Sequence, residues 1–350
     1  MAKAFDLAQW ARPEMLSLVP YISARDTFTA TVGKYTFLDA NENPNASAVN
    51  RYPDPNQFAL KKKIAALRGC AINQLLIGNG SDEILDLLFR AFCTPNKDNV
   101  ILMPPTYGMY AVLANINGVG IKEVPLMADF QLKTDEILAA IDPNTMAIFF
   151  CSPNNPSGNL FKNSDITALL NGFDGLVVID EAYIDFTDGT SWLTELDNYP
   201  NLVVTQTLSK AFGLAGLRLG IAIAQPNIIK LLHNIKPPYN INTLSQQKAI
   251  EALSDIGKIN KQIAELLAER SRVAAYLNEL DWIKTVFPSD ANFLLIRVDD
   301  ANKRYDALLA QKVVIRNRSA LINCENTLRI SIGTPEENNE LMAACKNISL

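Results

Sequence analysis

The sequence predicts an α/β protein: a large domain with a mostly parallel seven-stranded sheet covered by helices, and a smaller α+β domain. Between about residues 75 and 225, short continuous apolar runs alternate with helical stretches, which is typical of parallel strands buried on both faces. Beyond about residue 243, a long helical region is followed by strands and helices in mixed order. We therefore expect an N-terminal arm at 1–35, a large domain at 45–240, and a small domain formed by 36–44 and 241–350.

The individual elements follow from local patterns. Pro13 and Pro20 punctuate the arm, and an amphipathic helix is expected at 58–67. The strands of the large sheet are expected at 75–78, 100–103, 121–124, 146–151, 176–180, 202–205 and 219–224. Helices are expected among them at 83–92, 106–116, 134–140 and 165–170. The last part should contain helices at 243–280, 305–311 and 336–346, and strands at 293–298, 313–316 and 327–332.

Composition excludes several classes of function. The net charge of −5 and a pI near 5.1 argue against a nucleic-acid surface. No apolar run is long enough to span a bilayer, and the N-terminus lacks the apolar core of a signal peptide. Five cysteines with no C-x-x-C pair fit reduced thiols in the cytoplasm. The single histidine, His233, lies in a helix-like run, so we expect no metal site.

The stretch from 207 to 220, TLSKAFGLAGLRLG, follows a strand and carries one lysine beside a hydroxyl residue. Lys210 can form a Schiff base with the carbonyl of a phosphorylated cofactor. Ser209 and Arg218 can hold the phosphate of that cofactor. Taken alone, the same residues also fit a solvated loop lysine and an arginine whose stem covers apolar surface.

Other polar residues stand at the ends of predicted strands. Asp180 ends the apolar run LVVI, and it could pair with a protonated pyridine nitrogen or serve as a helix N-cap. Tyr183 could donate to a ring phenolate or be a core tyrosine. Asn155, in the turn SPNNPSG, could donate to the same phenolate, although turn chemistry alone also explains it.

Two further segments fit an anionic, flat ligand. The sequence Gly80-Ser81-Asp82 opens a helix, where free backbone N–H groups can bind phosphate. Tyr107, in PPTYG, lies just past a strand and could stack on a ring. In the C-terminal part, Arg329 lies in an apolar strand and needs an anionic partner. Arg316 could share that role or form a structural ion pair.

Together, the segments LDANENP, GNGSDE, PPTYGMY, CSPNNPSG, VVIDEAYIDF and TLSKAFGLAGLRLG resemble the fold-type I pyridoxal-phosphate aminotransferases, in the same order and at similar spacing. The closest resemblance is to the branch of that family that acts on histidinol phosphate. It covers nearly the whole chain, from YISAR at 21 to LRISIG at 328–333.

The resemblance implies a role for each matching position. Pyridoxal 5'-phosphate is the expected cofactor, with catalytic roles for Lys210, Asp180 and Tyr183. The other cofactor contacts it implies are Ser81, Asp82, Tyr107, Asn155, Ser209, Arg218 and Tyr52, the last from the neighbouring subunit of a homodimer. The substrate contacts it implies are Tyr21, Asn41, Arg316 and Arg329.

The same resemblance implies a ping-pong transaminase that exchanges an amino group between glutamate and a phosphorylated imidazole compound. Two alternatives share the scaffold: an aromatic amino-acid transaminase and a threonine-phosphate decarboxylase. A non-catalytic regulator is disfavoured, because no basic DNA-binding segment accompanies the cofactor motifs. We expect neither a membrane nor a nucleic acid as a partner.

Overall fold

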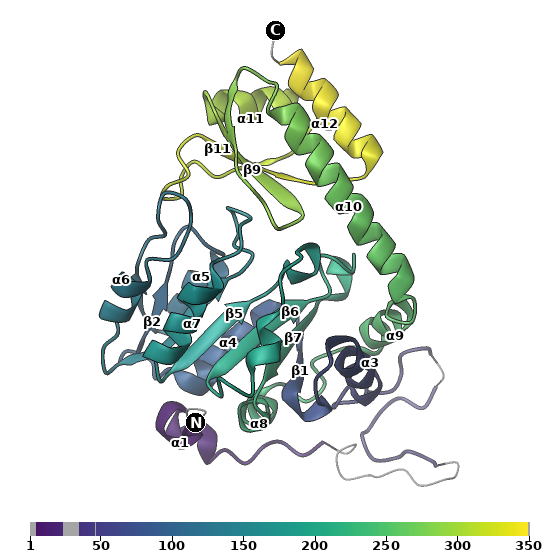
Figure 1. Ribbon diagram of the computed structural model, residues 1–350. Coiled ribbons are helices and arrows are strands. Elements are labelled where there is room, and N and C mark those ends of the chain that lie inside the picture. The colour runs from purple at the N-terminus through teal and green to yellow at the C-terminus, as the bar shows by residue number, and fades with distance from the viewer. Residues whose placement is uncertain (1–4, 24–34, 46, 349–350) are drawn as a thin grey trace.

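The computed structural model describes residues 5–23, 35–45 and 47–348, and its elements form two sheets (Figure 1). The larger sheet has seven strands in the order β1-β7-β6-β5-β4-β2-β3. Its strands are β1 (Leu75–Asn79), β2 (Asn99–Leu102), β3 (Gly120–Glu123), β4 (Thr145–Cys151), β5 (Leu176–Asp180), β6 (Leu202–Thr207) and β7 (Leu219–Ala224). Only β7 runs antiparallel to its neighbours β1 and β6. The predicted mostly parallel sheet is therefore confirmed.

Helices cover this sheet and bury its apolar strands. The helices before and among the strands are α1 (Leu7–Trp10), α2 (Pro13–Leu16), α3 (Phe58–Arg68), α4 (Ser81–Phe92), α5 (Met109–Ile116), α6 (Thr134–Ala139) and α7 (Asn163–Gly172), and α8 (Pro226–Ile235) follows β7. Every residue of β5, β6 and β7 is buried, as continuous apolar runs predict. Helix α4 packs against β1 and β7, and this contact holds the N-terminus of α4 against the start of β7.

The smaller sheet is antiparallel, in the order β10-β11-β9-β8, and it lies above the larger one in Figure 1. Its strands are β8 (Ile283–Val286), β9 (Phe293–Val298), β10 (Arg316–Asn317) and β11 (Thr327–Ser331). The helices of this part are α9 (Thr243–Ala252), α10 (Ile256–Leu277), α11 (Ala301–Ala310) and α12 (Pro335–Asn347). A second apolar core lies between this sheet and its helices.

Several predicted boundaries differ from those observed. The helical region expected at 243–280 is two helices, because Asp255 caps the start of α10 by accepting from the Lys258 backbone N–H. Helix α5 starts three residues late, since Pro104, Pro105 and Gly108 favour a turn before it. Strand β8 was not predicted, because its alternating residues are only partly buried.

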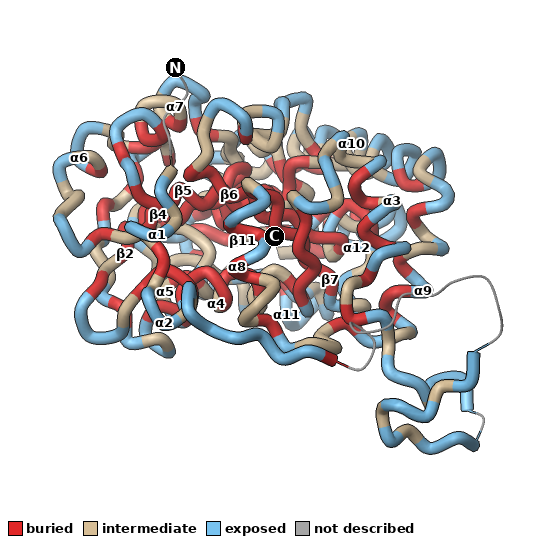
Figure 2. The backbone as a smooth tube through the Cα atoms, turned by 90° about the horizontal axis from the view of Figure 1, so that it is seen from below, coloured by how far each residue is buried: buried red, intermediate tan, exposed pale blue. Residues whose placement is uncertain are grey.

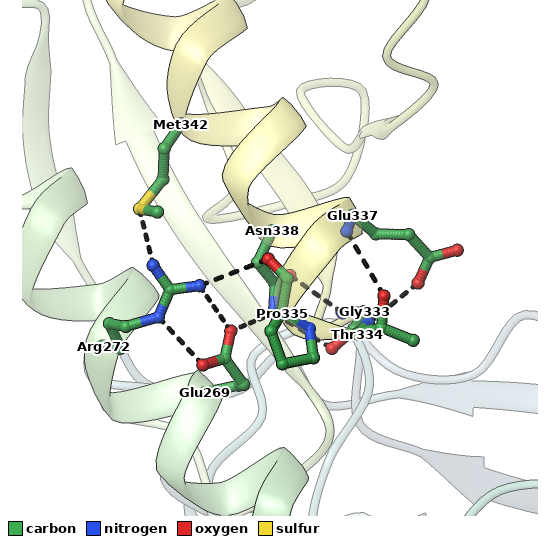
Figure 3. A network of polar contacts seen from close by, with 8 residues as sticks. All are labelled: Glu269, Arg272, Gly333, Thr334, Pro335, Glu337, Asn338 and Met342. Carbon is green, nitrogen blue, oxygen red and sulfur yellow. Dashed lines mark hydrogen bonds and ion pairs between the residues drawn. The ribbon is translucent and has the colours of Figure 1, made fainter.

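Helices α10 and α12 are joined by a network of polar contacts (Figure 3). Glu269 accepts from Arg272 at 2.6 Å and from the Asn338 amide at 2.8 Å. Asn338 also exchanges two hydrogen bonds with the backbone of Gly333, both 3.0 Å long. The network ties the end of β11 to α10, the long helix that connects the two sheets in Figure 1.

The described residues between 35 and 52 stand away from the body and are mostly exposed (Figures 1 and 2). Leu38 is 86% exposed and Tyr52 is 51% exposed, which is high for apolar and aromatic side chains. In the described part of the chain, no helix is both long and apolar enough to cross a membrane. The domain boundaries stay predictions, and residues 1–4 and 24–34 of the predicted arm lie outside the described ranges.

Candidate active site

A pocket of about 530 Å³ lies where the larger sheet meets the smaller one, and residues of both sheets line it. It brings together most of the predicted site residues: Ser81, Asp82, Tyr107, Asn155, Asp180, Tyr183, Ser209, Lys210, Arg218, Arg316 and Arg329. The pocket lies beyond the carboxyl ends of β4, β5 and β6, which is where ligands bind in sheets of this kind.

Asp180 is an acid that lines this pocket, and it forms no ion pair with any cation among the described residues. Its side chain is 3% exposed, and it accepts from the hydroxyl of Tyr110 at 2.9 Å and from the Ala182 backbone N–H at 3.2 Å. Burial raises the pKa of Asp180 to about 6, although the Tyr110 hydrogen bond lowers it. No helix starts here, so the N-cap interpretation is wrong. Instead, the carboxylate fits a cationic group bound in the pocket.

Lys210 follows β6 and lines the same pocket as Asp180. Its Nζ lies 5.7 Å from the ring centroid of Tyr183. Burial and, next, the charge of Arg329 lower the pKa of Lys210. A lysine with a lowered pKa is neutral more often, and so it is better able to act as a nucleophile or a base.

The start of α4 and the turn before β7 form one end of the pocket. The N-cap residue of α4 is Gly80, which has no side chain to accept a hydrogen bond from the first-turn backbone N–H groups. A Cβ on Gly80 would lie 2.7 Å from the Arg218 guanidinium, which shows how closely that arginine covers the helix start. A Cβ on Gly220 would collide with the backbone of Gly80 and Ser81. Small residues thus place an arginine and a helix N-terminus together, as an anion requires.

Tyr107 is held at this end by Asp82. The Tyr107 hydroxyl donates to Asp82 Oδ1 at 2.9 Å, and Arg218 lies 3.7 Å from Asp82 Oδ2. The Tyr107 ring meets the Tyr110 ring edge-on at 5.5 Å between centroids. The Asp82 side chain therefore orients two predicted cofactor contacts, in addition to the backbone role expected for it.

Asn155 connects Tyr183, on the side of the larger sheet, to Arg329 in the smaller sheet. Its amide lies 3.3 Å from the Tyr183 hydroxyl, and its Oδ1 accepts from Arg329 at 2.6 Å. The Arg329 guanidinium also lies over the Phe293 ring, 5.2 Å from the centroid. Arg329 forms no ion pair with any described acid, so its charge remains available to a ligand.

Three predicted residues do not lie in this pocket. Asn41 and Tyr52 line a separate hollow, where Tyr52 stacks on Tyr239 at 4.5 Å between ring centroids. Tyr21 is 72% exposed and lines another hollow beside His233. The roles predicted for these three residues stay predictions. The resemblance implies that Tyr52 contacts the cofactor of a neighbouring subunit, which the structure of one chain does not include.

Two residues at the site were not predicted from the sequence: Tyr110, which is buried against Asp180, and Arg318, which lines the pocket. Tyr110, the hydrogen-bond partner of Asp180, lies one helical turn after Tyr107, and that spacing of three could have indicated a shared face. Arg318 lines the pocket with Arg316 and Arg329. Its spacing of two from Arg316 would indicate a shared strand face, but the predicted strand ended at Arg316.

Comparison with known proteins assigns the chain to a family. A family model described as aminotransferase class I and II matches residues 32–344. The chain belongs to this family. Curated relatives of this aminotransferase include proteins named histidinol-phosphate aminotransferase from two organisms. The one from Flavobacterium johnsoniae is 55% identical, covering 95% of this chain and 96% of that protein. The one from Christiangramia forsetii is 52% identical, covering 99% of each.

Solved structures show the same fold as this aminotransferase. The histidinol-phosphate aminotransferase from Clostridium acetobutylicum superposes with a TM-score of 0.79 at 28% identity, covering 86% of this chain and 91% of that one. The enzyme from Sinorhizobium meliloti, solved in complex with pyridoxal-5'-phosphate, has a TM-score of 0.78 at 22% identity, covering 85% and 83%.

Class I and II aminotransferases use pyridoxal 5'-phosphate, and the residues of this pocket fit that cofactor. The buried Asp180 carboxylate has no ion-pair partner among the described residues, and a protonated pyridine nitrogen would supply one. The close contact of Arg218 with the start of α4 suits a phosphate. Lys210 lines the same pocket as Asp180 and Arg218, so it could form a Schiff base with the aldehyde of a bound cofactor. The assignment of individual roles stays a prediction.

Proposed function

We propose that this aminotransferase exchanges an amino group between glutamate and imidazole-acetol phosphate, producing 2-oxoglutarate and histidinol phosphate in histidine biosynthesis. The observation that carries the proposal is the identity of 52–55% along nearly the whole chain to proteins named histidinol-phosphate aminotransferase. The pocket supports it, because it combines a cofactor site with an arginine-rich wall suited to an anionic substrate.

We assign Lys210 the transfer of the substrate α-proton, and Asp180 the stabilisation of a protonated ring nitrogen on the cofactor. Lys210 Nζ would take the proton from the substrate α-carbon and hold it for the later protonation that the cofactor chemistry requires. Its lowered pKa favours the neutral amine that this step needs. When bound, the cofactor supplies an electron sink for the charge left on the α-carbon. Asp180 maintains that capacity by keeping the ring nitrogen protonated, and Tyr110 orients the Asp180 carboxylate.

The smaller sheet supplies the substrate anion site. Arg329 and Arg316 pair directly across β10 and β11, and both line the pocket. Arg329 would bind the carboxylate of glutamate in one half-reaction, and it would contribute to binding the phosphate of the second substrate in the other. A guanidinium suits both, because it donates two parallel hydrogen bonds to either group.

The proposal includes a homodimer in the cytoplasm. Residues 35–45 and 47–52 stand away from the body with Leu38 and Tyr52 exposed, and a second copy would cover them. Tyr52 would then reach the cofactor phosphate of the partner. All five cysteines are free thiols, which suits a reducing compartment.

The test is a two-substrate assay with the purified holoenzyme. Histidinol phosphate and 2-oxoglutarate should give glutamate at a rate well above that with phenylalanine or tyrosine as donor. Threonine phosphate should release no carbon dioxide. Faster turnover of an aromatic donor would favour the aromatic transaminase, and carbon dioxide release would favour the decarboxylase. Either result would overturn the proposed substrate.

A further inference from the structure

Arg318 follows β10 and lines the pocket wall beside Arg316 and Arg329. Its backbone N–H donates to the Thr327 carbonyl at 2.9 Å, which continues the ladder between β10 and β11 beyond the Arg316–Arg329 pair. Side chains two residues apart on a strand share a face. This geometry explains how three guanidinium groups reach one wall of the pocket.

In the described part of the chain, no carboxylate forms an ion pair with these three arginines. None of the ion pairs between described residues involves Arg316, Arg318 or Arg329. Arg318 is half-buried, and its Nε is buried without a hydrogen-bond partner. Burial, followed by the charges of Arg329 and Arg316, lowers the pKa of Arg318. Like charges opposite each other in a sheet destabilise it, so this cluster is poorly explained by folding alone.

An anion at the wall would relieve this repulsion, and its charge decides how much. A phosphate ester carries about −1.5 to −2 charges and three acceptor oxygens, whereas a carboxylate carries one charge and two oxygens. Two guanidinium groups are sufficient for a carboxylate. The third guanidinium, that of Arg318, therefore adds more binding energy for a phosphate ester, which has one more oxygen and a larger charge than a carboxylate.

We propose that Arg318 is a substrate-binding residue that makes this anion subsite prefer a phosphate dianion to a carboxylate. The inference rests on the proposed function for the identity of the substrate, and it adds the group that discriminates between the two half-reactions. Glutamate would use Arg329 with little help from Arg318. The phosphorylated substrate would use all three arginines.

The experiment measures binding to the holoenzyme by calorimetry, with ethyl phosphate as the dianion and propionate as the monoanion. Pyridoxal phosphate already occupies its own anion site in the holoenzyme, so the probes report on the substrate wall. The variants are Arg318→Ala and Arg318→Lys. Arg90→Ala is the matched control, because Arg90 is an exposed arginine on α4 that pairs with Asp86 outside the pocket.

We expect Arg318→Ala to weaken ethyl phosphate binding about 10- to 100-fold, and propionate binding less than about threefold. Arg318→Lys should recover part of the loss, because it restores the charge but not the two parallel donors. Arg90→Ala should change neither. An equal loss for the two probes, or no loss for ethyl phosphate, would overturn the proposal.

A second measurement separates ligand binding from a structural role. The thermal midpoint of Arg318→Ala without probe should equal or exceed that of the wild type, because the substitution removes like-charge repulsion. A clear fall in the midpoint would show that Arg318 supports the fold, and it would contradict the proposal. Ethyl phosphate binding does not depend on turnover. A wild type that binds it through Arg318 but leaves histidinol phosphate unreacted would therefore overturn only the proposed function.

Discussion

Asp180 shows how a single buried carboxyl group can mark a cofactor site. It accepts from the Tyr110 hydroxyl and from the Ala182 backbone N–H, and burial holds its pKa near 6 instead of the ordinary 3.8. Without a cation, such a group opposes folding whenever it is ionised. The site is therefore arranged for a positively charged ring and carries an energetic cost in its absence.

This cost predicts the pH dependence of the apoenzyme. Because the folded-state pKa is raised, the stability contributed by Asp180 is present below about pH 4 and is lost as the pH rises through about 6. We compare the free energy of unfolding of the wild type with that of Asp180→Asn. The value for the wild type minus that for the variant should fall by about 3 kcal/mol between pH 4 and pH 8. Denaturant unfolding at several pH values measures it. A difference that does not change with pH would contradict this account.

Lys210, Asp180 and Asn155 were predicted from recognisable segments at strand ends, and Arg329 from its place within an apolar strand; all four line the pocket. Tyr110 was not assigned: its spacing from Tyr107 indicates a shared face, but its partner Asp180 is 70 residues away in the sequence. Arg318 was missed because the strand that orients it is only two residues long and has no apolar pattern. Sequence patterns do not predict residues whose roles depend on contacts between distant helices and strands.

At the scale of elements, the contact between α4 and β7 builds the end of the pocket where we expect the cofactor phosphate to bind. Gly220→Ala should separate the two, because its Cβ collides with the backbone of Gly80 and Ser81. We expect a loss of about 1–3 kcal/mol in unfolding free energy and at least about tenfold weaker cofactor binding. Fluorescence titration with pyridoxal phosphate measures the second effect. The control is Gly216→Ala, whose Cβ meets nothing within 4 Å; equal effects in the two variants would count against the model.

The network between α10 and α12 makes a second prediction at this scale (Figure 3). Asn338→Ala removes the amide that serves Glu269 and both backbone groups of Gly333. Leaving these groups unpaired should lower the free energy of unfolding by about 2–4 kcal/mol. The exposed neighbour offers a matched change, Asn339→Ala, which should cost less than about 0.5 kcal/mol. Chemical denaturation of both variants distinguishes a stabilising network from surface contacts.

Element boundaries were predicted well where burial is complete and poorly at turns and edges. Strands β5, β7 and β9 match their predicted ranges, since apolar runs bounded by polar residues define them. Strand β8 is only partly buried and alternates weakly, so it carries no such signal. The break between α9 and α10 depends on a cap at Asp255 that periodicity does not reveal.

At the scale of the whole molecule, the projecting segment predicts shared active sites. If Tyr52 completes the partner's cofactor site, mixing the inactive variants Lys210→Ala and Tyr52→Ala should restore activity, because one site of each heterodimer then carries neither change. Refolding the two together and assaying at limiting cofactor measures this, and each variant refolded alone is the control. Heterodimers that form without regaining activity would show that Tyr52 does not act across the interface.

The central claim is that Lys210 holds the cofactor opposite Asp180, and borohydride reduction of the holoenzyme tests it most directly. Reduction fixes the cofactor to the lysine that carries it, and digestion with mass spectrometry identifies the peptide. Lys61 is a natural competitor, since burial and then the charge of Lys236 lower its pKa to about 8. We predict that the label lies on Lys210 and is lost in Lys210→Arg. A label on Lys61 or on any other amine would contradict the account.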